Sequence, residues 1–386
     1  MASVRKRIWT APDGTSKFAW QVDYRDQSGK RHSKQFQRKK DAEKWLNEAL
    51  WEVGRGVHTH DNDSITVADA GKLWLVAKRA DALEPATISA YDQHLRLHIN
   101  PLCGSVKLSQ LSTPVIEGYR DKLINNLSRP MASRVLRSLK AILNEAMRHG
   151  YVAQNVAKVV NIKRQARAKS KITIPSQHKL RCLIEAAKAS ENPASFPFYC
   201  LLIFGGLRAS ELRGLSWSYV HLSTHKVEVA QRADRAGKIG ATKTAAAHRI
   251  IPLPEIAINA LKAWKLACPI TDQNLVFPSL SGKASSWNYL MDHVVDPVQV
   301  DAGEFDSIFN EVSEIVIRTR WGLHDFRHCA ASLWIEQKVN PKRVQYLMGH
   351  SSITVTFDTY GHLFEQSEKD AETSVAIEKA LFGDAT

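Results

Sequence analysis

Residues 324–362 read HDFRHCAASLWIEQKVNPKRVQYLMGHSSITVTFDTYGH, a run in which imidazoles, a guanidinium and a phenol lie among apolar residues. In its first half the apolar residues recur every three or four positions, which predicts a helix that begins near His324. His324 and Arg327 then lie three residues apart in the first turn. Because unpaired amides and the positive end of the helix dipole favour an anion, we expect this helix start to bind one.

The second half of the same run predicts two more helices. Asn340-Pro341 is typical of an N-cap followed by the first helical residue, and Gly349 is typical of a helix end. His350 therefore falls where the chain turns. The serines at 351–352 can cap a third helix that carries Tyr360, although the β-branched residues 353–356 disfavour a helix by propensity alone.

Two interpretations of these residues do not involve catalysis. HDFRH places His324 and His328 four residues apart, as in the HExxH motif of zinc proteases. However, Asp325 is one methylene shorter than the usual Glu, and the sequence offers no evident third ligand. Tyr360 taken alone would be an ordinary packing or surface tyrosine, but its polar neighbours favour a role in chemistry. We therefore predict no metal site here.

Two upstream stretches supply further cationic side chains. In YCLLIFGGLRASELRGLSW, residues 199–217, an apolar helix should end at Gly205-Gly206, and a new one should begin around Arg208. In GKIGATKTAAAHRIIPLP, residues 237–254, we predict a β-hairpin with Lys243 on its second strand and residues 250–253 on a third. Lys243 is not part of a phosphate-binding P-loop, because Thr242 stands where that motif requires its second glycine.

Five of these boxes, taken in order, resemble the tyrosine recombinase family of the phage-integrase type. They are GLRASEL, TKT, HDFRH, MGHSS and DTYGH, and the resemblance covers about residues 172–365. Any one box is weakly specific, whereas five at these separations are strongly so. Carried over by motif, the resemblance implies a catalytic pocket with a tyrosine nucleophile, made of Arg208, Lys243, His324, Arg327, His350 and Tyr360.

The chain departs from the family pattern in two places. His350 and Tyr360 lie ten residues apart, where many relatives have nine. The segment 293–320, which precedes His324, is longer than the minimal pattern and has no role that the sequence assigns.

The chemistry of these side chains agrees with the resemblance. Attack on a phosphodiester spreads negative charge over its oxygens, and two guanidiniums such as Arg208 and Arg327 suit that charge. A phenol has a pKa of about 10, so Tyr360 needs help to lose its proton. His324 could accept that proton, and His350 could donate a hydrogen bond to the phosphate.

The same chemistry accounts for the leaving group and for the energy of the reaction. Lys243 could supply the proton that the leaving 5′-oxygen needs. A phosphotyrosine is still a diester, so its energy is conserved and neither ATP nor a metal or other cofactor is expected.

Length and composition agree with a protein that acts on DNA. The 386 residues are too many for one ordinary core, and 53 Lys and Arg against 39 Asp and Glu give a net charge of +14. Such a balance favours a polyanionic partner. Five scattered cysteines without CxxC pairing, and the lack of a signal peptide or membrane span, favour reduced thiols and a cytoplasmic protein on the bacterial host nucleoid.

We predict a multidomain α+β protein with three domains. Residues 1–57 form a small β-β-β-α domain, which the resemblance implies is the arm-type DNA-binding domain. Residues 65–160 form a helical bundle, implied to be the core-binding domain, and residues 172–386 form a mainly helical catalytic domain with a β-hairpin sheet and a C-terminal tail. Candidate arm contacts are Arg5, Arg7, Lys30, Arg31 and Lys34.

The linkers and the tail have their own signatures. Residues 54–64, GRGVHTHDNDS, have no apolar period, which predicts a solvated linker. Their HTH triplet is only a weak indication of a metal site. Residues 162–172 carry five positive residues and no acid, which suits a tether along a duplex. The tail after Tyr360 has a helical apolar period, and the family suggests that it packs on a neighbouring protomer.

The function predicted from the sequence is site-specific DNA recombination through a 3′-phosphotyrosine, as carried out by the integrase of a prophage or other mobile element. The expected partners are double-stranded attachment sites, three more copies of the chain, and DNA-bending or excision-factor proteins. Two alternatives stay open: a catalytically inactive DNA-binding accessory protein on the same scaffold, and a type IB topoisomerase. The complete set of pocket residues disfavours the first, and the N-terminal unit disfavours the second.

Overall fold

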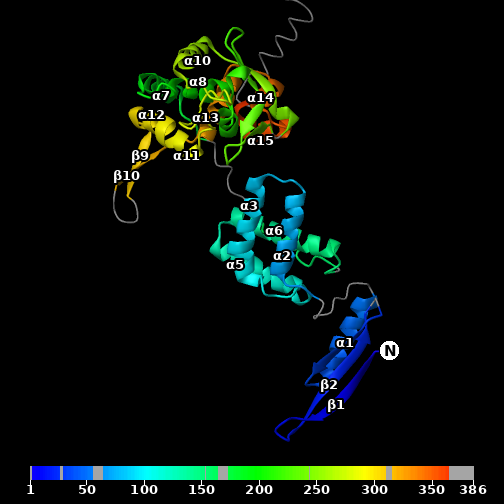
Figure 1. Cartoon of the computed structure of the whole chain (residues 1–386). Helices are drawn as coiled ribbons and strands as arrows, with labels where there is room; N and C mark the ends of the chain where they lie inside the picture. Colours follow the sequence, from blue (N-terminus) through cyan, green and yellow to red (C-terminus); the bar gives the residue numbers. More distant parts are fainter. Residues whose placement is uncertain are drawn as a thin grey trace, which may run out of the picture. The chain divides into compact units, whose positions relative to one another are not determined.

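The computed structural model describes residues 2–26, 29–54, 64–152, 154–163, 173–242, 244–309 and 315–364 (Figure 1). The chain divides into two compact units, residues 1–168 and 169–386. The boundary falls inside the basic stretch 162–172, most of which, like the linker at 55–63 and the tail from 365, lies outside the described residues. The finer division into three domains stays a prediction.

The N-terminal part is the predicted β-β-β-α arrangement. Strands β1 (Ser3–Thr10), β2 (Ser16–Arg25) and β3 (Arg31–Phe36) form an antiparallel sheet in the order β1-β2-β3, and helix α1 (Lys39–Gly54) packs on it. Val22 and Tyr24 point toward α1 and form a small core with Ala42 and Leu46. Since successive side chains alternate between faces, the other face of the sheet is left uncovered by α1.

The candidate arm contacts divide between the two faces of this sheet. Arg5 and Arg31 lie on the face opposite α1, where both make ion pairs with Asp23 at 3.1 and 3.5 Å. Lys34 instead lies on the helix-covered face, with its ammonium 4.7 Å from the centre of the Trp45 ring. The alternation along β3 therefore separates Lys34 from the arginines with which the sequence grouped it.

The helices of the first unit that follow α1 lie within residues 65–160, where the sequence predicts a helical bundle. Helix α2 (Val67–Ala80) is capped by Thr66, and α3 (Pro85–Gln93) continues through the π-helical turn η1 (His94–Ile99) into α4 (Asn100–Cys103). After the short turn η2 (Leu108–Gln110), helices α5 (Thr113–Asn126) and α6 (Arg129–Arg148) complete the bundle. The apolar face of α6 is buried: Val135, Leu136, Leu139, Ile142, Leu143 and Ala146.

The second unit is built around one wholly apolar helix. Helix α8 (Ser195–Gly205) is buried on nearly every side, and α7 (Gln177–Ala189), α10 (Glu255–Ala267) and α13 (Leu323–Glu336) pack around it (Figure 1). The remaining helices are α9 (Ala209–Arg213), α11 (Trp287–Leu290), the π-helical turn η5 (Met291–Val295), α12 (Asp296–Asp301), α14 (Pro341–Met348) and α15 (Ile353–Phe364). The three helices predicted over 324–362 are therefore confirmed as α13, α14 and α15.

The strands of this unit correct the predicted hairpin. Strand β7 (Ile239–Ala241) pairs with β6 (Gln231–Ala233), whereas β8 (Arg249–Pro252) pairs with β5 (Lys226–Val229), which in turn pairs with β4 (Val220–His221). The strands found at the two ends of the predicted hairpin, β7 and β8, thus belong to different sheets, and Lys243 of the predicted second strand lies outside the described residues. A 3₁₀ turn, η4 (Ala245–Ala247), separates β7 from β8, and Ile251 is buried opposite Val227, a partner far away in the sequence.

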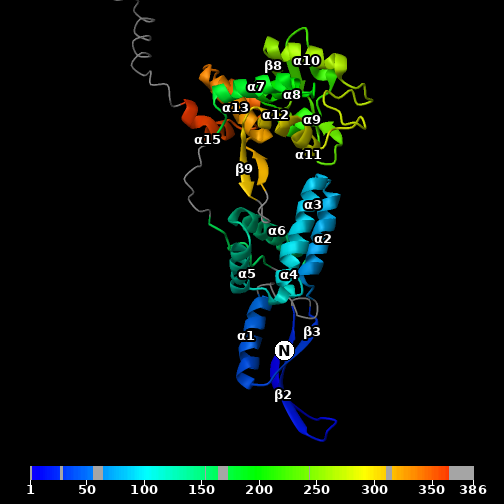
Figure 2. The same ribbon diagram turned by 90° about the vertical axis from the view of Figure 1, so that its left-hand side faces the viewer.

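The segment 293–320, unassigned from sequence, contains η5, α12 and a β-hairpin. Strands β9 (Phe305–Phe309) and β10 (Ile315–Thr319) pair with each other and extend away from the helices of their unit (Figure 2). At the base of the hairpin, the buried Glu304 accepts hydrogen bonds from Lys179 Nζ at 2.8 Å and Trp321 Nε1 at 2.9 Å. These contacts anchor the hairpin to α7.

Three of the five cysteines, Cys103, Cys200 and Cys329, are buried, and all five are free thiols, as the sequence predicted. Burial raises the pKa of each of the three buried thiols to about 12, so they are unreactive at neutral pH. Within the described ranges, none of the helices combines the length and apolar character needed to span a bilayer.

Gly214, the C-cap of α9, lies very close to the backbone of strand β6. A Cβ on Gly214 would lie 2.5 Å from Ala233 N and 2.7 Å from Arg232 Cα, and these backbone atoms cannot rotate away. We expect Gly214→Ala to force β6 from α9 and to lower the free energy of unfolding by about 1–3 kcal/mol. Urea unfolding measures this. Gly240→Ala, in the paired strand with no atom within 4 Å of the new Cβ, is the control. Equal midpoints for the two variants would contradict the close approach.

Candidate active site

Two of the predicted site residues, Arg208 and His350, lie at the ends of helices. Arg208 is the N-cap of α9, and it follows Gly206, whose φ of +55° and contact with α13 favour glycine. A Cβ on Gly206 would lie 3.0 Å from the Ala330 Cβ, so the α8–α9 turn approaches α13 closely. His350 follows Gly349, the left-handed C-cap of α14, as the sequence predicted.

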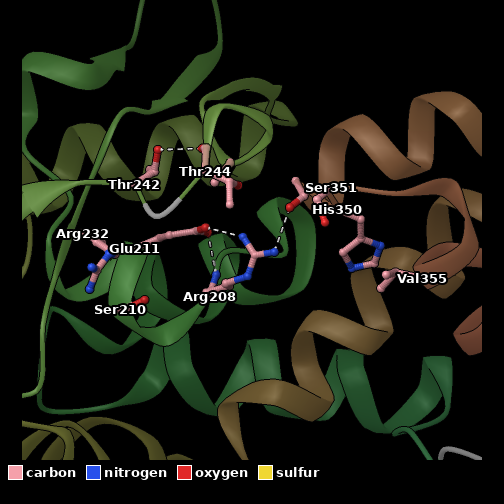
Figure 3. A pocket seen from close by; sticks show the side chains of 11 residues that line it. Arg208, Ser210, Glu211, Arg232, Thr242, Thr244, His350, Ser351 and Val355 are labelled. Carbon is pink, nitrogen blue, oxygen red and sulfur yellow. Dashed lines mark hydrogen bonds and ion pairs between the residues drawn. The ribbon is translucent and has the colours of Figure 1, made fainter. Parts of the chain in front are cut away.

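Arg208 and His350 line one pocket with a volume of about 310 Å³ (Figure 3). Its wall is rich in cationic and hydroxyl side chains: Arg208, Ser210, Glu211, Arg232, Thr242, Thr244, Ala247, Gly349, His350, Ser351 and Val355. Two guanidiniums and four hydroxyls in one hollow suit an anion with several oxygen atoms. Lys243 lies outside the described residues, but both of its sequence neighbours line this pocket.

The Arg208 guanidinium is held on two sides. Its Nη1 donates to Glu211 Oε1 at 2.7 Å, and its Nη2 donates to the Gly349 carbonyl at 2.8 Å (Figure 3). The backbone N–H of Arg208 also donates to Glu211 Oε2 at 2.8 Å. The side chain keeps 35% of its surface exposed, so a fixed cation faces the pocket.

A second arginine, Arg249, binds the same carboxylate as Arg208, and it is not among the site residues predicted from the sequence. Arg249 is 1% exposed, and its guanidinium donates to both oxygens of Glu211 at 2.8 and 3.1 Å and to the carbonyls of Leu347 and Ala247. Burial tends to raise the pKa of Glu211, but hydrogen bonds and charge from Arg249, with Arg327 and Arg208, lower it to about 2. One carboxylate therefore orients two arginines.

Arg327 lies deeper than Arg208. It is 1% exposed, and its guanidinium donates to the carbonyls of Gly206 and Met348, which link α13 to the ends of α8 and α14. Burial, followed by the charge of Arg208, lowers the pKa of Arg327 to about 9, which leaves it protonated at neutral pH. Its charge therefore sits beneath the pocket.

His350 is held neutral. Its Nδ1 lies 3.0 Å from Thr356 Oγ1 on α15. Burial, and then the charges of Arg327 and Arg208, lower its pKa to about 4. At neutral pH His350 can therefore offer a hydrogen bond but no charge.

Tyr360 is buried, with 2% of its surface exposed, and it does not line the pocket. Its ring packs with Ile335, Val344 and Met348, and its oxygen lies 2.7 Å from Nδ1 of His328. Burial raises the pKa of the phenol against the opposing charge of Arg327, so the resting phenol is neutral. The hydrogen-bond partner of Tyr360 is thus His328, a residue for which the sequence suggested only a possible role as a zinc ligand.

His324, the predicted proton acceptor, is exposed at the start of α13, and its ring stands edge-on to His328 with centroids 4.7 Å apart. In the part of the chain that the structure describes, no three His, Cys, Asp or Glu side chains are grouped as a metal site. The Asp325 side chain instead accepts from Gly322 N at 2.8 Å and caps α13.

Comparisons with known proteins agree with this fold. The model of the phage integrase family matches residues 176–367. A tyrosine recombinase XerC-like protein of Caldanaerobacter subterraneus subsp. tengcongensis is 25% identical over 380 residues, covering 90% of this chain and 92% of that one. The Tn1549 transposon integrase in complex with circular intermediate DNA has a TM-score of 0.64 at 18% identity, covering 81% of this chain and 99% of that one.

A lambda integrase tetramer bound to a Holliday junction gives a TM-score of 0.56 at 18% identity, over 90% of this chain and 96% of that one. These findings define an enzyme class, the site-specific recombinases. The chain belongs to the phage integrase family of tyrosine recombinases.

Proposed function

We propose that this recombinase integrates or excises a prophage or other mobile element by cutting and rejoining double-stranded DNA through a 3′-phosphotyrosine. The observation that carries the proposal is that Arg208 and His350 line one pocket, while the buried Arg327 lies close enough to His350 and to the Tyr360 phenol for its charge to favour a lower pKa of both. The transposon origin of the similar Tn1549 integrase supports a mobile element as substrate.

In the proposed reaction the phosphate occupies the pocket, where Arg208 and Arg327 neutralise the charge that develops on the oxygens. With Thr356 donating to its Nδ1, His350 would donate from Nε2 to the same phosphate. Tyr360 Oη attacks phosphorus, the bond to the 5′-oxygen breaks, and that oxygen takes a proton from Lys243. A 5′-hydroxyl of another strand reverses the step, because one diester replaces another.

The phenol must move before this reaction can occur. Tyr360 is buried outside the pocket, and Arg327 is covered by carbonyls, so DNA binding has to shift α15 and the end of α14. Such a shift would change the packing of α15, a helix of twelve residues, on α13 and α14.

The proposed partners follow from charge and from the similar structures. The open face of the N-terminal sheet, with Arg5, Arg7 and Arg31, suits the major groove of a second DNA site. Arg7 is paired in register with Ala19, so it shares this face with Arg5. A tetramer of this chain is proposed because the lambda integrase tetramer has the same fold.

A trapping experiment tests the proposed function. The chain is incubated with a library of nicked duplexes of randomised sequence, and protein–DNA adducts that resist detergent are isolated and sequenced. We expect adducts on the 3′-phosphate at a discrete set of sequences, followed by strand exchange between two duplexes that share them. Binding without any adduct would support the inactive accessory protein, and adducts without exchange would support the topoisomerase.

Lys243→Ala tests the proposed acid separately. On an ordinary substrate we expect its cleavage rate to fall by about 10²–10⁴-fold, as for loss of a general acid. On a substrate whose bridging 5′-oxygen is replaced by sulfur, we expect near-normal cleavage, because a thiolate leaves without a proton. Single-turnover cleavage of both substrates by both proteins measures this. If the sulfur substrate brings no recovery, Lys243 is not the acid.

A further inference from the structure

Helices α13 and α15 bring together two side chains, His328 and Tyr360, that lie 32 residues apart in the sequence. His328 lies one turn after His324 on α13, and its Nδ1 is 2.7 Å from the Tyr360 oxygen on α15. The two rings have centroids 5.6 Å apart and planes inclined by 64°. The imidazole is half-buried and the phenol fully buried, so the hydrogen bond is largely shielded from water.

The protonation of both groups sets the direction of this hydrogen bond. Burial, followed by the charges of His324 and Arg327, lowers the pKa of His328, and Asp325 only partly opposes them. The imidazole is therefore neutral at neutral pH, and the phenol keeps its hydrogen. Since a phenolic O–H is the stronger donor and an imidazole nitrogen the stronger acceptor, the phenol donates to Nδ1 and the ring carries its own hydrogen on Nε2.

The other histidines are worse placed to accept this proton. His324 contacts the edge of the His328 ring and has no hydrogen bond to the phenol among those of the described residues. The Nδ1 of His350 is engaged by Thr356. In the resting arrangement His328 is thus the neutral base that contacts the Tyr360 oxygen, and a role in the reaction requires this contact to persist when α15 shifts.

We propose that His328 is a further catalytic residue, the proton acceptor of the Tyr360 nucleophile. This inference rests on the proposed function. As Tyr360 Oη forms its bond to phosphorus, the Oη–H bond breaks, Nδ1 takes the proton, and His328 becomes an imidazolium. In the reverse step the phenolic oxygen leaves phosphorus and regains that proton. Arg327, which acts on the phenol by its charge, favours loss of the proton from Oη.

Chemical rescue tests this role. We expect His328→Ala to slow adduct formation on the trapped duplexes by about 10²–10⁴-fold. Added imidazole should restore part of the rate, and the rescue should grow with the neutral fraction of imidazole. A purely structural role would not respond to imidazole. Ser332→Ala, one turn further along α13, is the matched control and should keep the wild-type rate.

A second variant covers the case in which His328→Ala folds poorly. His328→Asn can still accept the phenolic hydrogen bond but cannot hold the proton, so we expect it to unfold like the wild type and to cleave as slowly as His328→Ala. A wild-type rate for His328→Asn, or no response of His328→Ala to imidazole, would overturn the inference. In both cases adducts formed by the wild type would leave the proposed function intact, whereas no adduct from the wild type would remove the function itself.

Discussion

Replacing Tyr360 with phenylalanine is expected to abolish the covalent protein–DNA adduct while DNA binding persists. The change removes one oxygen atom, the proposed nucleophile, and leaves a ring that still fills the space among Ile335, Val344 and Met348. Loss of an enzymatic nucleophile slows the chemical step by on the order of 10⁶-fold, which places adduct formation below detection. Gel-shift binding and detergent-resistant adducts, measured on the same duplex, separate the two effects.

The same substitution leaves the Nδ1 of His328 without its partner, at a cost of about 1–3 kcal/mol in stability at most. Tyr346→Phe is the matched control, because its hydroxyl accepts a hydrogen bond from Ile250 N at 3.0 Å and is not proposed to react. It should form adducts at the wild-type yield. If Tyr360→Phe formed adducts as well, another residue would be the nucleophile.

The second large effect is expected at Arg249. Arg249→Met removes the buried cation that meets both oxygens of Glu211, so a carboxylate that is 2% exposed keeps only Arg208 as a hydrogen-bonded cation. Breaking a buried pair by removing one partner costs about 3–5 kcal/mol. We expect urea unfolding at pH 7 to show this loss in the second unit. Adduct formation should fall too, because Glu211 also orients Arg208.

The pH dependence of stability provides a second test of the Glu211–Arg249 ion pair. The pKa of Glu211 is lowered from 4.5 to about 2 in the folded chain, so the stability that this shift contributes is present above pH 4.5 and is lost as the pH falls toward 2. In Arg249→Met we expect the pKa of Glu211 to be lowered less than in the wild type. The loss of unfolding free energy that Glu211 causes as the pH falls should therefore be smaller. Unfolding free energies measured between pH 7 and pH 3 test this sign.

Arg320→Met is the control for Arg249→Met, because Arg320 makes its short ion pair, at 2.7 Å, with the exposed Asp306 and lies 3.9 Å from the buried Glu304. An exposed pair contributes about 0–1 kcal/mol. An Arg249→Met variant as stable as Arg320→Met would show that Arg249 does not support Glu211.

Local sequence signals predicted much of the fold because they act within one turn or one strand. The Asn340-Pro341 start and the Gly349 stop of α14 are examples, since capping geometry depends on neighbouring residues. The β-β-β-α arrangement over residues 1–57 was predicted for the same reason. The predicted hairpin over 237–254 was wrong because strand pairing depends on partners elsewhere. Here β5 pairs with β8 and β6 pairs with β7.

By itself the sequence determined the three helices over 324–362, the boxes that carry Arg208, Arg327, His350 and Tyr360, and hence the family. Only the tertiary structure decided which side chains touch. Arg249 reaches Glu211 across 38 residues, and His328 meets Tyr360 across 32. The physical reason is that a buried ion pair or hydrogen bond depends on how helices and strands pack, and no periodicity within one segment encodes the position of another.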